Sequence, residues 1–161
     1  MKTKKLKALT LLISVVFWIN SCVKKEDYNN KLQEEPSPLV GTWKLVSGTT
    51  IKGKDTVVTD YTQNQEMIKI INETHFSFLR HDLKKGKDSA SIFVAGGGTY
   101  SLKGNKYIEH LDYFNIREWE GNSFEFEFRI DGDTLITQGV EKVEELNVNY
   151  YNIEKYHRVV Q

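Results

Sequence analysis

The 161-residue sequence contains one cysteine and two prolines, and basic residues are no more numerous than acidic ones. A single cysteine cannot form an intramolecular disulfide, and a domain of this size needs none, because it can bury about two thirds of its unfolded surface. Lys and Arg number 22, as do Asp and Glu, and no basic tract follows the first residues. Since phosphate binding needs clustered Lys and Arg, nucleic acid is not expected as a partner.

Catalytic and metal-binding patterns are also missing. The four histidines lack metal-site spacing: His75 and His81 share a strand face but lie about 20 Å apart at roughly 3.3 Å per residue. No Gly-x-Ser-x-Gly elbow is present, and "AGGGTYS" lacks the lysine of a phosphate loop. The "DGD" at 131–133 has no acidic residue at the twelfth calcium-loop position. We therefore predict no catalytic residues, no metal and no cofactor.

No stretch of ten or more residues carries a helical apolar stripe, although 61–66 could form a short helical turn. The dominant period beyond residue 38 is two. In "FEFEFRI" (124–130) the phenylalanines and the isoleucine fall on one face and the charged residues on the other. Hairpin turns are expected at Asp131-Gly132 and Gly104-Asn105. Further strands are predicted at 42–46, on both sides of residues 72–73, at 91–98 and at 149–160.

These elements predict an all-β fold, an antiparallel up-and-down barrel of about eight to ten strands. Closing the sheet removes the exposed edges that an open sheet would leave. A β-sandwich is the alternative, but it needs longer crossovers than most of these short connections provide. The glycines at 96–98 are expected to form a bulge or bend that lets a barrel strand curve.

The N-terminal 21 residues have the features of an export signal. Four lysines precede an apolar run at 8–19, which is too short to span a bilayer. "WINSC" then resembles the signal of bacterial lipoproteins, in which the chain is cut before the cysteine and its thiol is acylated. The resemblance implies a lipidated Cys22 and a bacterial cell-envelope protein, anchored to the outer membrane and facing the periplasm or the cell surface. The alternative is a plain signal peptide with an incidental cysteine.

Residues 22–38 would then form a polar tether that ends at Pro36 and Pro38, and 39–161 the folded domain. Of the 22 basic residues four lie in the leader, which leaves 18 against 22 acidic residues in the mature chain. "VKKEDY" after the cysteine resembles a surface-export tag of some lipoproteins, and a generic solvated linker explains it equally well.

The start of the domain, "GTW", resembles the Gly-x-Trp signature of lipocalins. In that family the tryptophan closes one end of the barrel under a basic residue of the last strand, which implies a structural set of Gly41, Trp43 and Arg158. An arginine over an indole contributes about 0.5 to 2 kcal/mol. Residues 39–159 are also similar to the lipocalin-like domain of uncharacterised anchored bacterial lipoproteins, through "LVGTWKLVS", "IKIINETHFSF", "GGGTYSLKGNKYIEH", "DGDTL" and "EKYHRV". The resemblance implies the barrel and leaves the activity open.

An eight-stranded barrel is either filled by side chains or holds one small ligand. If Tyr107 points inward, Glu109 does too, and its buried carboxylate then needs a partner or water. Arg80 could be that partner, or could bind the carboxylate of a fatty acid-like ligand. Alternatively this strand faces the other way and Glu109 is exposed. The candidate cavity residues are Phe76, Phe78, Arg80, Tyr100, Tyr107, Glu109, Tyr113, Phe124, Phe126 and Phe128.

Three functions are compatible with this pattern. The main hypothesis is a module that binds a small, hydrophobic or amphipathic molecule in the barrel. The second is a filled barrel whose rim, including Tyr61 or Trp119, binds an envelope protein or a glycan. The third is an enzyme, which would need a buried acid and base with perturbed pKa values.

Overall fold

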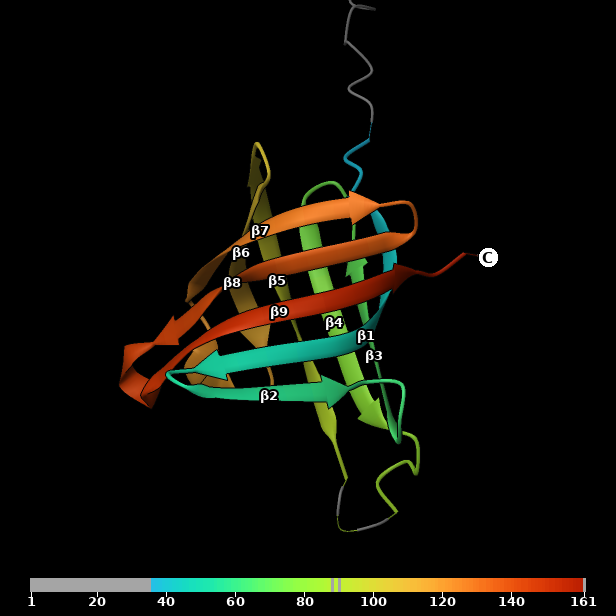
Figure 1. Cartoon of the computed structure of the whole chain (residues 1–161), viewed down its shortest axis with the longest axis vertical. Helices are drawn as coiled ribbons and strands as arrows, with labels where there is room; N and C mark the ends of the chain where they lie inside the picture. Colours follow the sequence, from blue (N-terminus) through green and yellow to red (C-terminus); the bar gives the residue numbers. More distant parts are fainter. Residues whose placement is uncertain (1–35, 88, 90, 161) are drawn as a thin grey trace, which may run out of the picture. The chain divides into compact units, whose positions relative to one another are not determined.

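The structure is a computed structural model that describes residues 36–87, 89 and 91–160. The predicted leader, the lipidated Cys22 and nearly all of the tether lie outside these residues. The described part is all-β, as predicted, and belongs to one compact unit (Figure 1). Its elements are β1 (Gly41–Lys52), β2 (Asp55–Asp60), β3 (Gln65–Ile71), β4 (His75–Asp82), β5 (Phe93–Lys103), β6 (Lys106–Phe114), the 3-10 turn η1 (Arg117–Trp119), β7 (Ser123–Asp131), β8 (Thr134–Val143), the 3-10 turn η2 (Glu144–Leu146) and β9 (Val148–Arg158).

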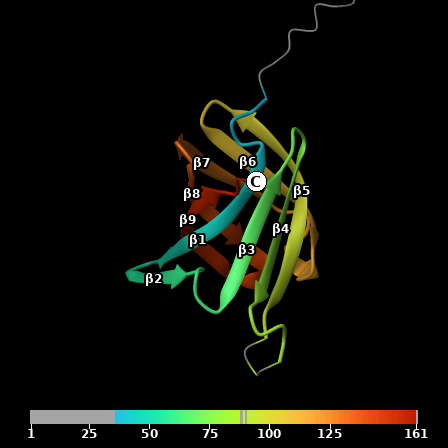
Figure 2. The ribbon, with the colours of Figure 1, turned by 90° about the vertical axis from the view of Figure 1, so that its right-hand side faces the viewer.

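Eight of these strands form a closed antiparallel up-and-down barrel. β3 to β9 pair in chain order, and β1 closes the ring by pairing with β9 on one side and β3 on the other. In Figure 2, β3, β4 and β5 form one wall beside β1. The closure confirms the predicted barrel and excludes the β-sandwich.

The extra strand is β2, which forms a hairpin with the second half of β1. β1 pairs with β3 from Gly41 to Lys44 and with β2 from Ser47 to Lys52. A bulge at Val46 interrupts the β1–β9 ladder where β1 changes its neighbour, and the Val46 carbonyl accepts a hydrogen bond from the Tyr61 amide. One end of β1 is therefore held away from β3, and the barrel is wider there.

A second bulge lies in the β5–β6 ladder at the predicted glycine bend. Gly97 pairs with Tyr113 and Gly98 with Leu111, so Asp112 is an extra residue in β6. A side chain on Gly98 would place its Cβ 1.9 Å from the carbonyl oxygen of His110. Only glycine allows this close approach of the two backbones.

The bulge also corrects the predicted position of Tyr113. Tyr107, Glu109 and Leu111 point inward and are buried, as strict alternation predicts. After the extra residue the alternation is offset, so Phe114 points into the barrel and Tyr113 lies outside with 70% of its surface exposed. Tyr113 is therefore not part of the interior.

Three other local predictions differ from the structure. Residues 61–64 form a turn before β3 rather than a helix. The strands predicted at 91–98 and before the Gly104 turn are one continuous strand, β5. β2 was not predicted, because its sequence "DTVVTD" is short and mostly exposed and so shows no alternation between apolar and polar residues.

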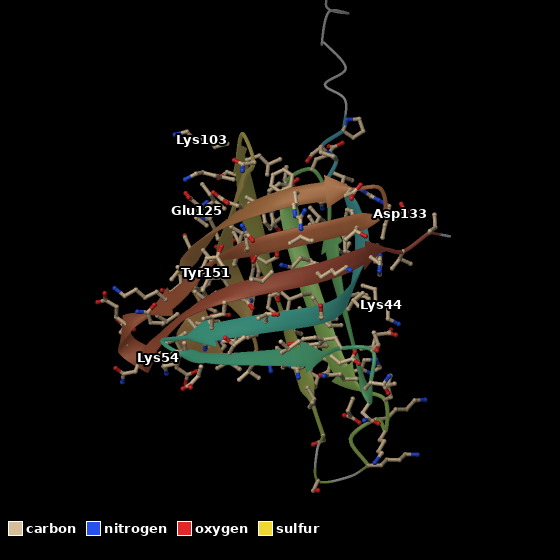
Figure 3. All side chains as sticks on the ribbon, viewed as in Figure 1. Lys44, Lys54, Lys103, Glu125, Asp133 and Tyr151 are labelled. Carbon is tan, nitrogen blue, oxygen red and sulfur yellow. The ribbon has the colours of Figure 1, made fainter. Side chains whose placement is uncertain are left out.

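The fully buried part of the core lies mainly at one end of the barrel, and Val143 adds a buried residue toward the other end. Its fully buried side chains include Leu39, Trp43, Leu45, Leu135 and Tyr156. Charged side chains such as Lys103 and Glu125 lie on the outside (Figure 3). This packed end supports the wider end, where the cavity described below is found.

We predict that Gly98→Ala lowers the free energy of unfolding by about 2 to 3 kcal/mol, because the added methyl group collides with the β6 backbone. Ser101→Ala on the same strand is the control, since Ser101 is exposed. Urea denaturation of both variants measures the difference. Equal stability of G98A and S101A would show that the two strands do not approach as closely as described.

Candidate functional site: a cavity in the wide end of the barrel

The barrel contains a cavity of about 320 Å³ that opens to solvent at its wide end. Ligand pockets in proteins commonly measure about 300 to 1,000 Å³, so this space can hold a small molecule. On β9 the lining residues lie farther from Arg158, the partner of Trp43, than the buried Tyr156 does, whereas on β3 the lining residue Lys69 pairs directly with Trp43. The cavity is lined by Gly48, Thr50, Thr59, Tyr61, Met67, Lys69, Phe78, Arg80, Val94, Glu109, Leu111, Phe114, Ile116, Trp119, Phe124, Phe126, Glu141, Tyr150, Asn152 and Glu154.

One wall of the cavity is aromatic. Phe114 packs edge-on against Phe78, with ring centroids 5.5 Å apart, and against Trp119 at 6.1 Å. Trp119 in turn lies 6.0 Å from Phe124. These rings come from β4, β6, η1 and β7, and the bulge in β6 is what brings Phe114 into the group. The wall offers flat apolar surface to a ligand.

The inner end of the cavity is charged. Lys69 Nζ donates to Glu109 Oε1 at 2.7 Å, and both side chains are at least nine-tenths buried. The ammonium also lies over three aromatic rings of the packed core, at 5.7 Å from Phe76, 5.9 Å from Tyr107 and 5.5 Å from Tyr156. These contacts offset part of the cost of burying the charge.

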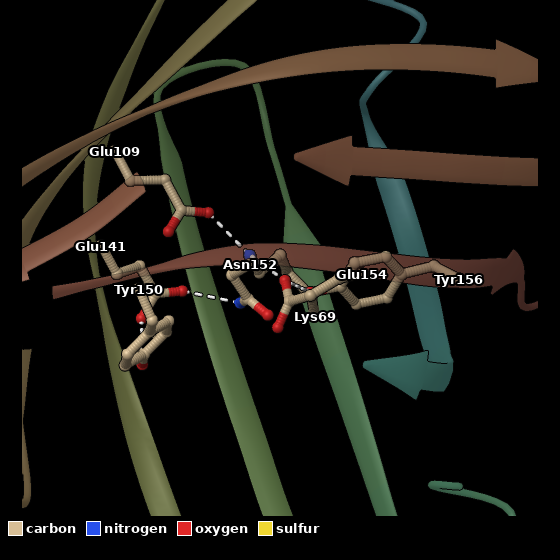
Figure 4. A network of polar contacts seen from close by, with 7 residues as sticks. All are labelled: Lys69, Glu109, Glu141, Tyr150, Asn152, Glu154 and Tyr156. Carbon is tan, nitrogen blue, oxygen red and sulfur yellow. Dashed lines mark hydrogen bonds and ion pairs between the residues drawn. The ribbon is translucent and has the colours of Figure 1, made fainter. Parts of the chain in front are cut away.

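Two more carboxylates, Glu141 and Glu154, line the same cavity from β8 and β9 (Figure 4). Glu141 accepts hydrogen bonds from the Tyr150 hydroxyl at 2.6 Å and the Asn152 amide at 2.7 Å. Glu154 accepts one from the Tyr156 hydroxyl at 2.5 Å, and its Oε2 lies 3.9 Å from Lys69 Nζ. Lys69, Glu109, Glu141 and Glu154 are called the polar cluster below.

The acid groups shift the pKa values of their neighbours. Burial alone would lower the pKa of Lys69, but Glu109 and Glu154 raise it above its ordinary value, so the ammonium stays charged. Burial raises the pKa of Glu141, and the Glu154 charge raises it further. Burial and the Glu154 carboxylate likewise raise the pKa of Tyr156, whose hydroxyl remains a donor.

The structure brings some of the predicted cavity residues together and places others elsewhere. Those that line the cavity are Phe78, Arg80, Glu109, Phe124 and Phe126.

The other predicted cavity residues lie outside the lining. Phe76 and Tyr107 are buried in the core beneath it. Tyr100 donates from its hydroxyl to the Asn72 carbonyl at 2.8 Å, and Phe128 packs against the core. Tyr113 lies on the outer face.

The predicted pairing of Arg80 with Glu109 does not occur. Arg80 donates from Nε to Gln65 Oε1 at 2.9 Å and lies over the Tyr61 ring, with its guanidinium carbon 5.0 Å from the centroid. The partner of Glu109 is Lys69 instead, because Lys69 lies on the inward face of β3 between Met67 and Ile71. Arg80 is left at the mouth of the cavity.

The sequence did carry a signal for the missed members of the polar cluster. Lys69 stands between Met67 and Ile71 in the inward row of β3, and Glu154 stands next to Tyr156 in the inward row of β9. Polar residues in inward positions of a barrel strand indicate a polar interior. These residues could be recognised only once the inward face of each strand was known.

Gly41, Trp43 and Arg158 meet at the packed end, and none of the three lines the cavity. The Arg158 guanidinium carbon lies 4.0 Å from the Trp43 ring centroid, and its nitrogens donate to the carbonyls of Val40 and Pro38 at 2.9 Å each. Trp43 is fully buried and donates from Nε1 to the Leu39 carbonyl. Gly41 has a φ of 148°, and a Cβ there would lie 2.5 Å from an Arg158 nitrogen.

Within residues 36–87, 89 and 91–160, no three His, Cys, Asp or Glu side chains are grouped so that they could hold a metal ion. The same residues contain no helix long and apolar enough to cross a membrane. The chain matches no known protein-family model and no curated protein sequence. The closed antiparallel barrel of eight strands, with its aromatic cluster, is what makes the fold lipocalin-like.

We predict that Lys69→Met lowers the free energy of unfolding by about 3 to 5 kcal/mol, because it leaves the Glu109 carboxylate buried without a cation. The double variant Lys69→Met with Glu109→Leu should recover most of this loss, since an apolar pair needs no charge partner. Thermal and urea unfolding measure both effects.

Lys44→Met is the matched control for this prediction. Lys44 pairs with Glu66 on the surface, with 43% and 40% of the two side chains exposed, so its removal should cost less than about 1 kcal/mol. If K69M is no less stable than K44M, the Lys69–Glu109 pair is not buried as described.

Proposed function

We propose that this protein binds a small, partly apolar molecule in the wide end of its barrel. The observation that carries this proposal is the cavity itself: about 320 Å³, with an aromatic wall on one side and a polar cluster at its inner end. Apolar walls with a few fixed polar groups are typical of ligand pockets.

The cavity favours this function over the rim-binding alternative. A filled barrel would leave Tyr61 and Trp119 free to form an exposed surface patch. Here both side chains line the cavity, and neither is fully exposed. The aromatic residues that could have marked a protein-binding or glycan-binding rim therefore support a ligand site instead.

The proposal includes the cellular setting inferred from the sequence. Acylation of Cys22 would anchor the protein to the outer membrane of a bacterial envelope, with the barrel in the periplasm or at the cell surface. The protein would act there as a non-enzymatic carrier or receptor for its ligand. Palmitate labelling of the wild type and of Cys22→Ser in cells tests the anchor.

We predict that the uncharged fluorescent dye prodan binds the cavity and that Val94→Trp weakens this binding at least about tenfold. Val94 lines the cavity, and the larger side chain would occupy space that the dye needs. Prodan fluorescence titration measures the affinity.

Val140→Trp is the matched control, because it makes the same substitution on the outer face of β8, where Val140 is 50% exposed. It should leave the affinity unchanged. Absence of prodan binding to the wild type, or equal binding by V94W, would contradict a cavity-bound ligand.

A further inference from the structure

The charges that line the cavity are not balanced. Three carboxylates, from Glu109, Glu141 and Glu154, surround the single buried cation Lys69. Arg80 is the other lining cation, but it lies at the mouth, where its contacts are with Gln65 and Tyr61. The inner part of the cavity therefore carries more negative than positive charge.

Of the three carboxylates, Glu141 has the least compensation for its negative charge. Its hydrogen-bond partners Tyr150 and Asn152 are both neutral, whereas Glu109 has a close ion pair with Lys69 and Glu154 has a long one. The Glu154 charge acts unfavourably on Glu141 and raises its pKa, in addition to the effect of burial. Asn152 lies between the two carboxylates (Figure 4), and a cation bound beside them would relieve both effects.

A second observation at the inner end points to an incomplete set of polar contacts. The Tyr107 hydroxyl is fully buried and has no hydrogen-bond partner among the described residues. Burial is the largest cause of the raised pKa of the Tyr107 hydroxyl, and the nearby Glu109 carboxylate raises it further. A buried hydroxyl without a partner is costly, and Tyr107 lies in the core directly beneath the cavity, so the polar contacts next to Glu109 are incomplete.

We infer that the ligand of this cavity is a small organic cation: a protonated amine held in the negative field of Glu141 and Glu154, attached to an apolar body that packs on Phe78, Phe114 and Trp119. This inference rests on the proposed function and specifies its ligand class. Among the described residues, no three His, Cys, Asp or Glu side chains are grouped as a metal site. An ammonium needs no such group, because a single carboxylate can accept its hydrogen bond.

The three probes phenethylamine, phenethyl alcohol and phenylacetate test the charge. They share an aromatic body and differ in carrying a positive charge, no charge or a negative charge at neutral pH. Competition against bound prodan gives each affinity. We expect phenethylamine to bind at least about tenfold more tightly than phenethyl alcohol, because a hydrogen bond to an ionised group is stronger than one between neutral groups. Phenylacetate should bind most weakly.

Two variants place the effect at the polar cluster. Glu141→Gln and Glu154→Gln should each reduce the preference for the amine over the alcohol to within about threefold. Two variants are used so that a folding defect in one leaves the other as the test, and circular dichroism identifies such a defect. Glu145→Gln is the matched control, since Glu145 is exposed on η2, and it should keep the full preference.

The outcomes separate this inference from the proposed function. If prodan binds but phenethylamine binds no more tightly than phenethyl alcohol, or phenylacetate binds best, the inferred cationic ligand is wrong and the cavity function stands. An amine preference that survives in both E141Q and E154Q would also overturn the assignment to these residues. If neither prodan nor any probe binds, both the cation and the cavity function are wrong.

Discussion

The ion pair between Lys69 and Glu109 is the interaction on which the interior of this barrel depends. It lies at the boundary between the two ends: the rings of Phe76, Tyr107 and Tyr156 pack below the ammonium, and the cavity opens above it. Two charges at least nine-tenths buried are stable only while they remain paired and hydrogen-bonded. The pair therefore interrupts the apolar core at this level of the barrel, and the cavity next to it is polar at its base.

Two bulges in the backbone create the cavity next to this ion pair. The bulge at Val46 lets β1 leave β3 for β2, which widens one end, and the glycines of β5 let β6 bulge so that Phe114 joins the aromatic wall. In the packed part of the core, Trp43 is fully buried with the Arg158 guanidinium over its ring. A packed core, a charged base and an aromatic wall together form a site whose chemistry suits an amphipathic ligand better than a purely apolar one.

Much of the fold could be predicted from the sequence, because period-two alternation and hairpin turns are local signals. The 104–105 turn and the inward phenylalanines of β7 are of this kind, whereas the Gly41–Trp43 opening was predicted from its resemblance to the lipocalin signature. The polar cluster was harder to predict. Lys69, Glu109, Glu141 and Glu154 come from four strands, and their proximity depends on barrel closure and register, which no single segment encodes. Tyr113 shows the same limit, since one extra residue in β6 reversed its direction.

The most direct test of this account is a high-resolution crystal structure of the protein purified from its own host without denaturation. We expect Lys69 and Glu109 to remain paired, and an organic molecule or a group of ordered waters to occupy the space beside Glu141 and Glu154. A barrel in which Phe78, Phe114 and Trp119 close over this space, with Lys69 turned out to solvent, would contradict it.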